Sequence, residues 1–580
     1  MSRRSMLTAL LTLAVLTACG SIQPRDTADA SRAGADLVLR GGRIYTVDER
    51  QPWAQAVAIR DGRFIYVGDD AGVQSFVGAR TRVSDLGGKL AIPGLVDAHT
   101  HPGNMGHYGD KWPEISATDH EEVLAQIAAY ANAHPELDWI VMSGFPTGSY
   151  GKAGPHKRDL DRIVPDRPVY LVGNVGHSRW FNSRALEIMG LDRNTPDTVP
   201  DLARFARDPD GELTGWTTEW AFAPYLAPFL EADVEANRAG IAHFLNYLSS
   251  LGVTTLMDGG NRWYADDVTP LLAELDQSGR MPVRYEGVYH IYVPDQVPGA
   301  IDELLRMREN YAGDRLKFNT IKIHFDGTNE IRTAALLDPF SDDPGNRGNT
   351  LIGERALSAF ILELNEVGLD LHLHCVGDRA IRVALDAVEL ARNSLDEPLH
   401  TRITLTHLEI IDPADYPRFR ELGVFANYTP AWHAYWEDDL TRTTLGQRYA
   451  KSFLIRPLLD HGATVTFSSD TTSLESIEEA NPYLGMQTAH NRQYPPDGPD
   501  ATIREPVADR LSLEELIKGY TISGATQLRM NEDIGSIEVG KLADLVVLDR
   551  NLFEIDRYEI SEATPEAVLM EGEVIHGRLP

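Results

Sequence analysis

Two histidines separated by a single residue close an apolar segment near the start of the chain. The segment reads Gly94-Leu-Val-Asp97-Ala-His99-Thr-His101. The apolar run from Leu90 to Val96 predicts one buried strand, and side chains two positions apart on a strand point to the same face. Two imidazoles on one face can bind the same metal ion. The pair alone is equally consistent with two chance histidines at a strand end, so the rest of the chain must decide.

Four further residues with metal-binding or proton-transfer chemistry stand at or near the ends of other apolar segments. They are Lys322, His374, His407 and Asp470. An isolated lysine or aspartate of this kind is more often part of an ion pair or a helix cap. Their assignment therefore depends on whether the fold brings them together. The segments are Ile321-Lys-Ile-His-Phe-Asp-Gly327, Leu373-His-Cys-Val-Gly-Asp-Arg-Ala380, Leu405-Thr-His-Leu-Glu409 and Phe467-Ser-Ser-Asp-Thr471.

Eight apolar segments of strand length, most of them followed by a segment of helix length, run through the middle of the chain. This alternation predicts an α/β fold, a (β/α)8 TIM barrel. Catalytic groups of such barrels stand at the C-terminal ends of the strands, so we expect the candidate residues to meet in one cavity. The predicted strands are Leu95 to His99, Val253 to Asp258, Val283 to Tyr289, Ile321 to Phe325, Leu369 to His374, Ile403 to His407, Val424 to Tyr428 and Thr464 to Ser468.

The flanks of the barrel predict two further units. The long interval 102–251, between the first and second barrel strands, contains strands of its own and predicts an inserted α/β lobe. Short segments separated by turn residues at 36–90 and 531–580 predict that the two ends of the chain form one small β-sandwich. The barrel itself would then comprise 91–101 and 252–530.

The first residues predict an export signal rather than a membrane span. Arg3 and Arg4 precede an apolar run from Met6 to Ala18 that is too short to cross a bilayer. The run ends in Leu16-Thr-Ala-Cys19, which resembles the lipobox of bacterial lipoproteins. We therefore expect a signal peptide at 1–18, a lipid at Cys19 and a flexible tether at 19–35. The protein would be exported, by a twin-arginine or a general secretory route, and lipid-anchored to a membrane of the bacterial envelope, facing the periplasm or the outside.

The composition indicates a large folded protein and argues against nucleic-acid partners. The 580 residues are 43% hydrophobic, which is too apolar for a disordered chain. The 86 acidic and 54 basic side chains give a net charge of −32, and such a surface repels phosphates. We therefore expect no nucleic acid as a partner.

The order and spacing of these motifs resemble the amidohydrolase superfamily, in the branch of YtcJ-like proteins and N-substituted formamide deformylases (amidohydrolase family 3). The resemblance covers nearly all of the chain after the signal. One departure, Thr328-Asn-Glu-Ile331 in place of a turn rich in Ser and Gly, bears on substrate specificity rather than on metal ligands. The motifs that carry the resemblance are Pro93 to His101, Lys322 with Asp326-Gly327, His374 to Arg379, Ser469-Asp470, Gly535 to Asp544, and, in the lobe, His177 to Leu186 and Asp210 to Glu219.

The resemblance implies a centre of two Zn(2+) ions bridged by Lys322, carboxylated on its amine. His99 and His101 would bind the more buried ion, and His374 and His407 the more exposed one. Asp470 would contact the inner ion and serve as general base and acid, taking the proton of a metal-activated hydroxide and passing it to the leaving group.

The implied activity is hydrolysis of a non-peptide carbon–nitrogen bond in a small N-acyl, N-formyl or cyclic amide. A lactonase or esterase would use the same site. A non-catalytic binding or regulatory lipoprotein of the envelope is an alternative from another class. Whether the chain forms a homodimer is left open.

The remaining candidates are substrate contacts and packed histidines. His324 and His372 share the strand parity of Lys322 and His374, so either could line the cavity, although core packing with one hydrogen bond is the favoured account of both. Substrate contacts are predicted for His177, Trp180, Glu219, Arg332, Tyr428 and Trp432.

Overall fold

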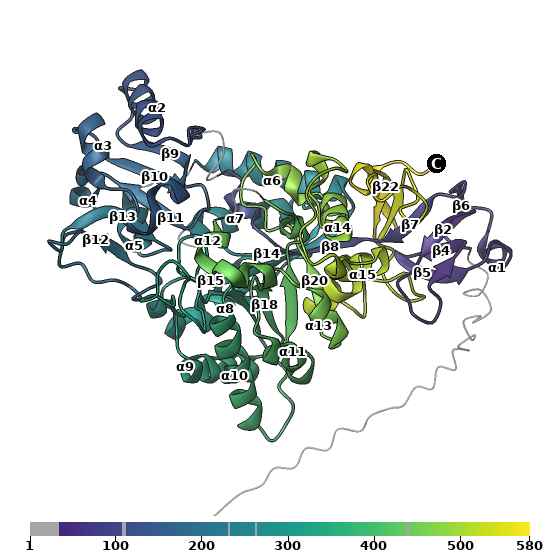
Figure 1. Ribbon diagram of the computed structural model, residues 1–580. Coiled ribbons are helices and arrows are strands. Elements are labelled where there is room, and N and C mark those ends of the chain that lie inside the picture. Colours follow the sequence, from purple (N-terminus) through teal and green to yellow (C-terminus); the bar gives the residue numbers. More distant parts are fainter. Residues whose placement is uncertain (1–33, 107–111, 230–232, 262–263, 437–439) are drawn as a thin grey trace, which may run out of the picture.

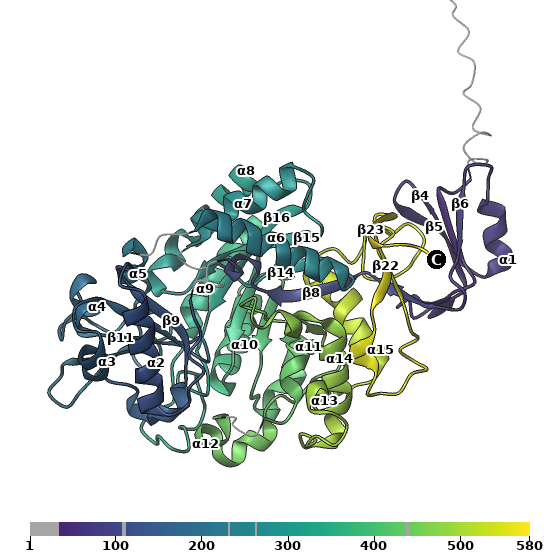
Figure 2. The same ribbon diagram turned by 90° about the horizontal axis from the view of Figure 1, so that it is seen from above.

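The computed structural model describes residues 34–106, 112–229, 233–261, 264–436 and 440–580. They form a barrel with a lobe at one end and a pair of sheets at the other (Figure 1, Figure 2). The predicted signal peptide at 1–18, Cys19 and most of the tether lie outside the described residues. Within the described ranges, no helix has the length and apolar character that a membrane span requires.

Eight parallel strands form the barrel, in the order in which they follow one another in the chain. The prediction of eight barrel strands is confirmed, although the end residues differ. Most positions of these strands are buried on both faces, which explains why they read as continuous apolar runs. The strands are β8 (Leu95–Thr100), β14 (Val253–Asp258), β15 (Arg284–Ile291), β16 (Leu316–His324), β17 (Asp370–Cys375), β18 (Ile403–His407), β19 (Phe425–Tyr428) and β20 (Val465–Phe467).

The first and last strands of the barrel meet just beyond their C-terminal ends. The backbone N–H of Asp470 donates to the carbonyl of His99 at 2.9 Å, and that of His101 donates to the carbonyl of Thr471 at 3.1 Å. This contact places the segment after β20 directly beside the His-x-His pair.

Helices cover the outside of the barrel (Figure 1). In α9 (Glu354–Val367), apolar residues recur at helical spacing and form a buried face of Leu357, Phe360, Ile361 and Leu364. The helix ends at Gly368, whose φ of 70° suits glycine. The other helices of the barrel are α6 (Val234–Ser250), α7 (Ala265–Gln277), α8 (Ala300–Tyr311), α10 (Asp378–Asn393), α11 (Tyr416–Leu422), α13 (Arg456–Asp460), α14 (Pro482–Asn491), α15 (Leu513–Lys518) and α16 (Gly524–Gln527).

The two ends of the chain form a β-sandwich, as predicted. β7 (Leu90–Pro93) pairs antiparallel with β21 (Leu545–Leu548), and Leu39 and Val547 belong to one core between the sheets. The first sheet contains β1 (Leu37–Arg40), β4 (Ala56–Arg60), β5 (Arg63–Gly68) and β6 (Arg82–Asp85). The second contains β7, β21, β2 (Arg43–Tyr45), β3 (Trp53–Ala54), β22 (Pro565–Met570) and β23 (Glu573–Gly577).

The apolar run from Leu90 to Val96 is two strands, and the prediction of one strand is wrong. The run divides at Gly94, so that β7 belongs to the sandwich and the barrel begins at Leu95 rather than at 91. A Cβ atom at Gly94 would lie 2.5 Å from Oγ1 of Thr254. A residue without a side chain is therefore required where the chain passes between the two units.

The inserted lobe is built on a five-stranded sheet. Its predicted end at 251 is wrong, because α6 packs against β14 of the barrel and against β22 and β23 of the sandwich. The strands of the lobe are β9 (Ile140–Phe145), β10 (Val169–Gly173), β11 (Ser178–Phe181), β12 (Phe205–Arg207) and β13 (Leu213–Thr218), and its longer helices are α2 (His120–Ala133), α3 (Lys157–Ile163) and α4 (Ser183–Ile188).

Candidate metal centre and active-site cavity

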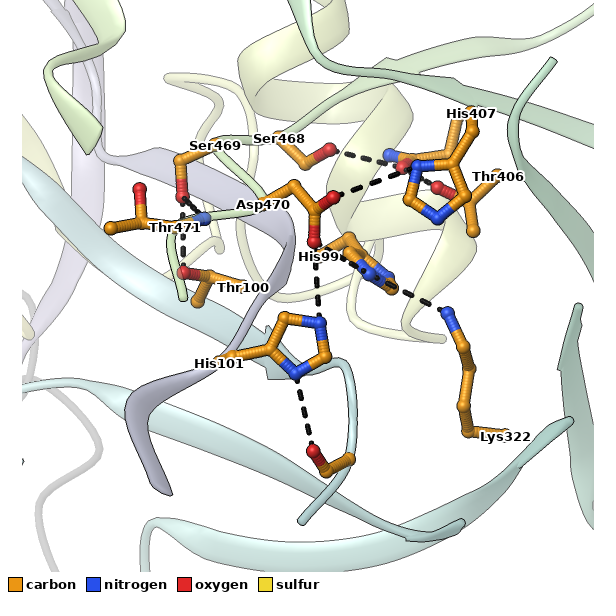
Figure 3. A network of polar contacts seen from close by, with 12 residues as sticks. His99, Thr100, His101, Lys322, Thr406, His407, Ser468, Ser469, Asp470 and Thr471 are labelled. Atoms are coloured by element: carbon orange, nitrogen blue, oxygen red, sulfur yellow. Dashed lines mark hydrogen bonds and ion pairs between the residues drawn. The ribbon is translucent and has the colours of Figure 1, made fainter. Parts of the chain in front are cut away.

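The carboxylate of Asp470 lies at the centre of the candidate site (Figure 3). Its Oδ1 atom is 3.2 Å from Nε2 of His99 and 3.2 Å from Nε2 of His101. Its Oδ2 atom is 3.7 Å from Nδ1 of His407. The ends of β8 and β18 and the segment after β20 therefore supply side chains to one point.

Lys322 and His374 complete the set from the neighbouring strands β16 and β17. Nζ of Lys322 is 3.5 Å from Nε2 of His99. The ring centres of His374 and His407 are 4.3 Å apart. All six residues predicted as metal ligands line the same cavity.

The hydrogen bonds of two imidazoles leave lone pairs available at this centre. Nδ1 of His101 faces the carbonyl of Gly260 at 3.1 Å, and Nε2 of His374 faces the carbonyl of Gly327 at 3.3 Å. Because a carbonyl only accepts hydrogen bonds, these nitrogens carry the protons, and in the neutral rings the other nitrogen keeps its lone pair. In His101 that other nitrogen faces the carboxylate of Asp470. Two electron-rich groups in this position fit a cation between them.

Burial keeps three histidines of the centre, His99, His374 and His407, neutral. Burial, followed by the nearby Lys322 amine, lowers the pKa of His99 to about 3. Burial also holds the pKa of His374 and of His407 well below the usual value. Within the described residues, Nδ1 of His407 is buried without a hydrogen-bond partner. Neutral imidazoles and a carboxylate are the donors that zinc-like ions bind, so the residues present fit a metal centre.

Two residues outside the predicted set hold candidate ligands in place. Asp97 accepts hydrogen bonds from the hydroxyl of Ser469 at 2.6 Å and from its backbone N–H at 3.1 Å, which orients the residue preceding Asp470. Nε2 of His372 lies 2.8 Å from Nδ1 of His99. His372 is thus packed with one hydrogen bond, as expected, and that bond goes to a candidate ligand. Asp97 stands two residues before His99, and His372 two residues before His374, so each shares a strand face with a candidate ligand. This spacing is the sequence signal that could have identified them.

Three residues of the site adopt a backbone conformation that is unusual for residues other than glycine. φ is 78° at His407, 49° at Asp470 and 50° at Glu219. Such conformations cost about 1–3 kcal/mol each and persist where the surrounding structure enforces them, often at functional sites. The strained backbone at the end of β18 and in the segment after β20 therefore helps to direct the side chains of His407 and Asp470 toward the cavity.

A cavity of about 850 Å³ lies over this centre and is lined by both the barrel and the lobe. Trp432 lines it and stacks on His407, with ring centres 5.6 Å apart. Thr328 and Glu330 also line it. The segment 328–331, for which the sequence predicts an effect on substrate specificity, therefore borders the cavity.

Glu219 connects the lobe to the barrel behind the cavity wall. It is 1% exposed and is not among the residues that line the cavity, so its prediction as a direct substrate contact is wrong. Its Oε2 atom lies 2.7 Å from Nδ1 of His177 and 3.0 Å from Nε2 of His324, and its Oε1 atom accepts a hydrogen bond from the hydroxyl of Thr333. Burial opposes ionisation of Glu219, but its interactions with His177 and His324 hold its pKa below the usual range. Both histidines line the cavity, so His324 combines the expected buried position and hydrogen bond with the alternative prediction that it reaches the cavity.

Trp180 is not a cavity residue, and its prediction as a substrate contact is wrong. The side chain is fully buried in the lobe, where it packs against Phe145 and Tyr150. Its neighbour Arg179 lines the cavity instead. Adjacent residues of a strand point to opposite faces, so only one of the two can reach the site.

Arg332 and Tyr428 also lie outside the cavity lining, and their prediction as substrate contacts is wrong. Arg332 forms an ion pair with Asp342. Tyr428 is buried, and its hydroxyl donates to the carbonyl of Leu454 at 3.1 Å. Both polar groups are occupied by structural partners.

Comparison with known proteins gives relatives over nearly the whole chain. A profile described as "Amidohydrolase family" matches residues 82–576. Exoenzymes regulatory protein AepA of Pectobacterium carotovorum subsp. carotovorum is 30% identical over 75% of this chain and 94% of its own. Putative amidohydrolase YtcJ of Bacillus subtilis is 27% identical over 93% of this chain and 99% of its own. N-substituted formamide deformylase of Arthrobacter pascens is 26% identical over 93% and 97%.

A solved structure shares the fold. An uncharacterized metal-dependent hydrolase from Pyrococcus furiosus superposes with a TM-score of 0.63 and 24% sequence identity. The match covers 89% of this chain and 99% of that chain. The arrangement of barrel, lobe and sandwich is therefore not peculiar to this sequence.

Proposed function

The chain belongs to the amidohydrolase family, and from that premise we propose that it hydrolyses a non-peptide carbon–nitrogen bond at the Asp470 centre. The substrate class would be a small N-acyl, N-formyl or cyclic amide. One observation carries the proposal: four histidines, Lys322 and Asp470 converge, buried or nearly so, on one cavity. The cavity volume of about 850 Å³ is in the range of small-molecule sites.

The proposed centre holds two divalent ions, for which zinc is the first choice. His99 and His101 would hold one ion, and His374 and His407 would hold the other. If its neutral amine added carbon dioxide and lost a proton, Lys322 would offer anionic carbamate oxygens to these ions. Ions bound there supply Lewis acidity, which polarises a substrate carbonyl and lowers the pKa of water toward about 7.

Asp470 moves the proton in this proposal. Its carboxylate accepts the proton of the attacking water and delivers it to the nitrogen of the leaving amine. Asp97 orients Ser469 and thereby the turn that carries Asp470. The carboxylate therefore remains in place through both transfers, which general acid–base catalysis requires.

Two alternatives use the same cavity. A lactonase or esterase would need the same ligands and differ only in the leaving group. The name of the formamide deformylase relative favours the carbon–nitrogen bond. A regulatory protein without turnover is favoured by the name of the AepA relative, whereas the complete donor set around Asp470 favours an enzyme.

A substrate panel tests the proposal. Purified metal-loaded protein is assayed against formamides, other N-acyl amines, cyclic imides, lactones and esters. We expect at least one amide to be hydrolysed with a kcat/KM above that of its matched ester. Turnover of esters alone would select the lactonase alternative. No turnover at all, in folded and metal-loaded protein, would select the regulatory alternative.

We also propose that the chain is exported and anchored by lipid at Cys19, on the basis of the apolar run and the lipobox-like Leu16-Thr-Ala-Cys19. A Cys19→Ala variant should then leave the membrane fraction, while the unchanged chain sediments with membranes. A Cys375→Ala variant is the matched control, because Cys375 is buried in β17 and outside the signal. Continued firm attachment of the Cys19→Ala chain would contradict lipidation.

A further inference from the structure

The lobe contributes a histidine, His177, to the cavity, and a buried carboxylate fixes the orientation of its ring. His177 follows the turn between β10 and β11 and lines the cavity, with 18% of its side chain exposed. Glu219, at the end of β13, is 1% exposed and lies behind it. Nδ1 of His177 lies 2.7 Å from Oε2 of Glu219, closer than Nε2 of His324, which lies 3.0 Å from the same oxygen.

The partners of Glu219 determine which nitrogen of His177 carries the proton. The ionised carboxylate can only accept hydrogen bonds, so Nδ1 of His177 is the donor. The backbone N–H of Glu219 donates to the carbonyl of His177 at 2.8 Å, which fixes the two residues to each other a second time. In the neutral ring, Nε2 then keeps its lone pair and is a hydrogen-bond acceptor.

The same contacts indicate that His177, Glu219 and His324 form a hydrogen-bonded network rather than a further metal site. Glu219 already receives hydrogen bonds from His177, His324 and Thr333. Both of its oxygens are thus occupied by donors from the lobe and from the barrel. Because Nδ1 is engaged by Glu219, Nε2 is the nitrogen of this cavity-lining ring that remains for a ligand.

We propose that His177 is a specificity-determining residue that accepts a hydrogen bond from an N–H group of the substrate, and that Glu219 is its positioning residue. This inference rests on the proposed amide hydrolysis and deepens it, because it names secondary amides, which have an N–H group, as the preferred class. An ester or a tertiary amide has no N–H group to donate. When bound in the cavity, such a substrate would cover the Nε2 acceptor of His177 without supplying a donor, which is a basis for discrimination.

Three matched substrates test the inference. They are the best secondary amide of the panel, its N-methyl derivative, which is a tertiary amide, and the ester that has the same acyl group and the corresponding alcohol in place of the amine. For the unchanged enzyme we expect kcat/KM to be about ten-fold or more higher for the secondary amide than for the N-methyl amide. In His177→Phe the ring shape remains and the acceptor is lost. The ratio should therefore fall toward one, mainly through the secondary amide.

Variants of Glu219 separate positioning from general damage. A glutamine at 219 can still offer its carbonyl oxygen to both imidazoles and its amide to Thr333, so Glu219→Gln should keep the preference for N–H substrates. Glu219→Leu removes the acceptor that selects the His177 tautomer and should lose the preference. Metal content is measured in every variant, and the ratio of two substrates cancels differences in the amount of active protein.

The possible results are distinguishable. An equal loss on all three substrates in His177→Phe, or no preference in the unchanged enzyme, would overturn the inference while amide hydrolysis stands. An unchanged enzyme that hydrolyses no amide would overturn the proposed function and the inference with it. A folding failure of Glu219→Leu leaves the decision to His177→Phe and Glu219→Gln.

Discussion

Replacing Asp470 with asparagine is expected to lower kcat by about 10²–10⁴-fold, the usual contribution of a positioned proton-transfer group. Asparagine keeps the size of the side chain and an oxygen near His99 and His101, but an amide cannot take a proton from water and return it to a leaving nitrogen. KM should change far less than kcat. Steady-state kinetics on the best amide of the panel measures both values.

The control for this variant is an acidic residue far from the cavity. Asp266 in α7 has 90% of its side chain exposed, so Asp266→Asn should leave kcat unchanged within about two-fold. Metal content must accompany the kinetics, because Asp470 is also a candidate ligand. Full activity of Asp470→Asn with bound metal would contradict the role of Asp470 in proton transfer.

Removing the divalent ions is expected to abolish turnover and to destabilise the fold. The donors of the centre are buried, and without a cation the lone pair of His101 faces the Asp470 carboxylate. An ion present at about 100 times its dissociation constant stabilises the folded state by about 2.7 kcal/mol, and chelation removes that contribution. Thermal unfolding and activity are measured before chelation, after chelation and after zinc is added back. Activity that persists in protein shown to contain no metal would contradict the proposed centre.

A variant of His372 tests the same centre without removing a proposed ligand. His372→Phe keeps a planar ring beside His99 and removes the nitrogen that lies 2.8 Å from Nδ1 of His99. Loss of such an orienting partner usually weakens metal affinity about 10–100-fold. Competition with a chelator of known affinity measures the change. The exposed His576 in β23 provides the control, and His576→Phe should bind metal like the unchanged chain.

The barrel could be predicted because its strands are buried on both faces and therefore appear as separate apolar runs. The six candidate ligands could be predicted from the positions of these strands, since residues at or near the C-terminal ends of the strands of a parallel barrel lie around the same end of the barrel. The division at Gly94 could not be predicted in this way. Apolar residues continue across it, and only the close approach of Thr254 shows that two units meet there.

The substrate contacts were predicted less well, for a physical reason. Trp180, Arg332 and Tyr428 have side chains that suit a binding site, but each could equally satisfy its chemistry inside the fold, and each does. Residue type says what a side chain can bind. It does not say on which side of its strand or loop the side chain stands.

The sequence by itself determined the class of fold, the family resemblance and the donors at the strand ends, because these depend on local spacing along single strands. Only the tertiary structure decided that Glu219 of the lobe contacts His324 and Thr333 of the barrel, and that His177 is held at the cavity by that carboxylate. Those contacts join segments that are distant in the chain. Their geometry depends on how the lobe packs against the barrel, which no local pattern of residues specifies.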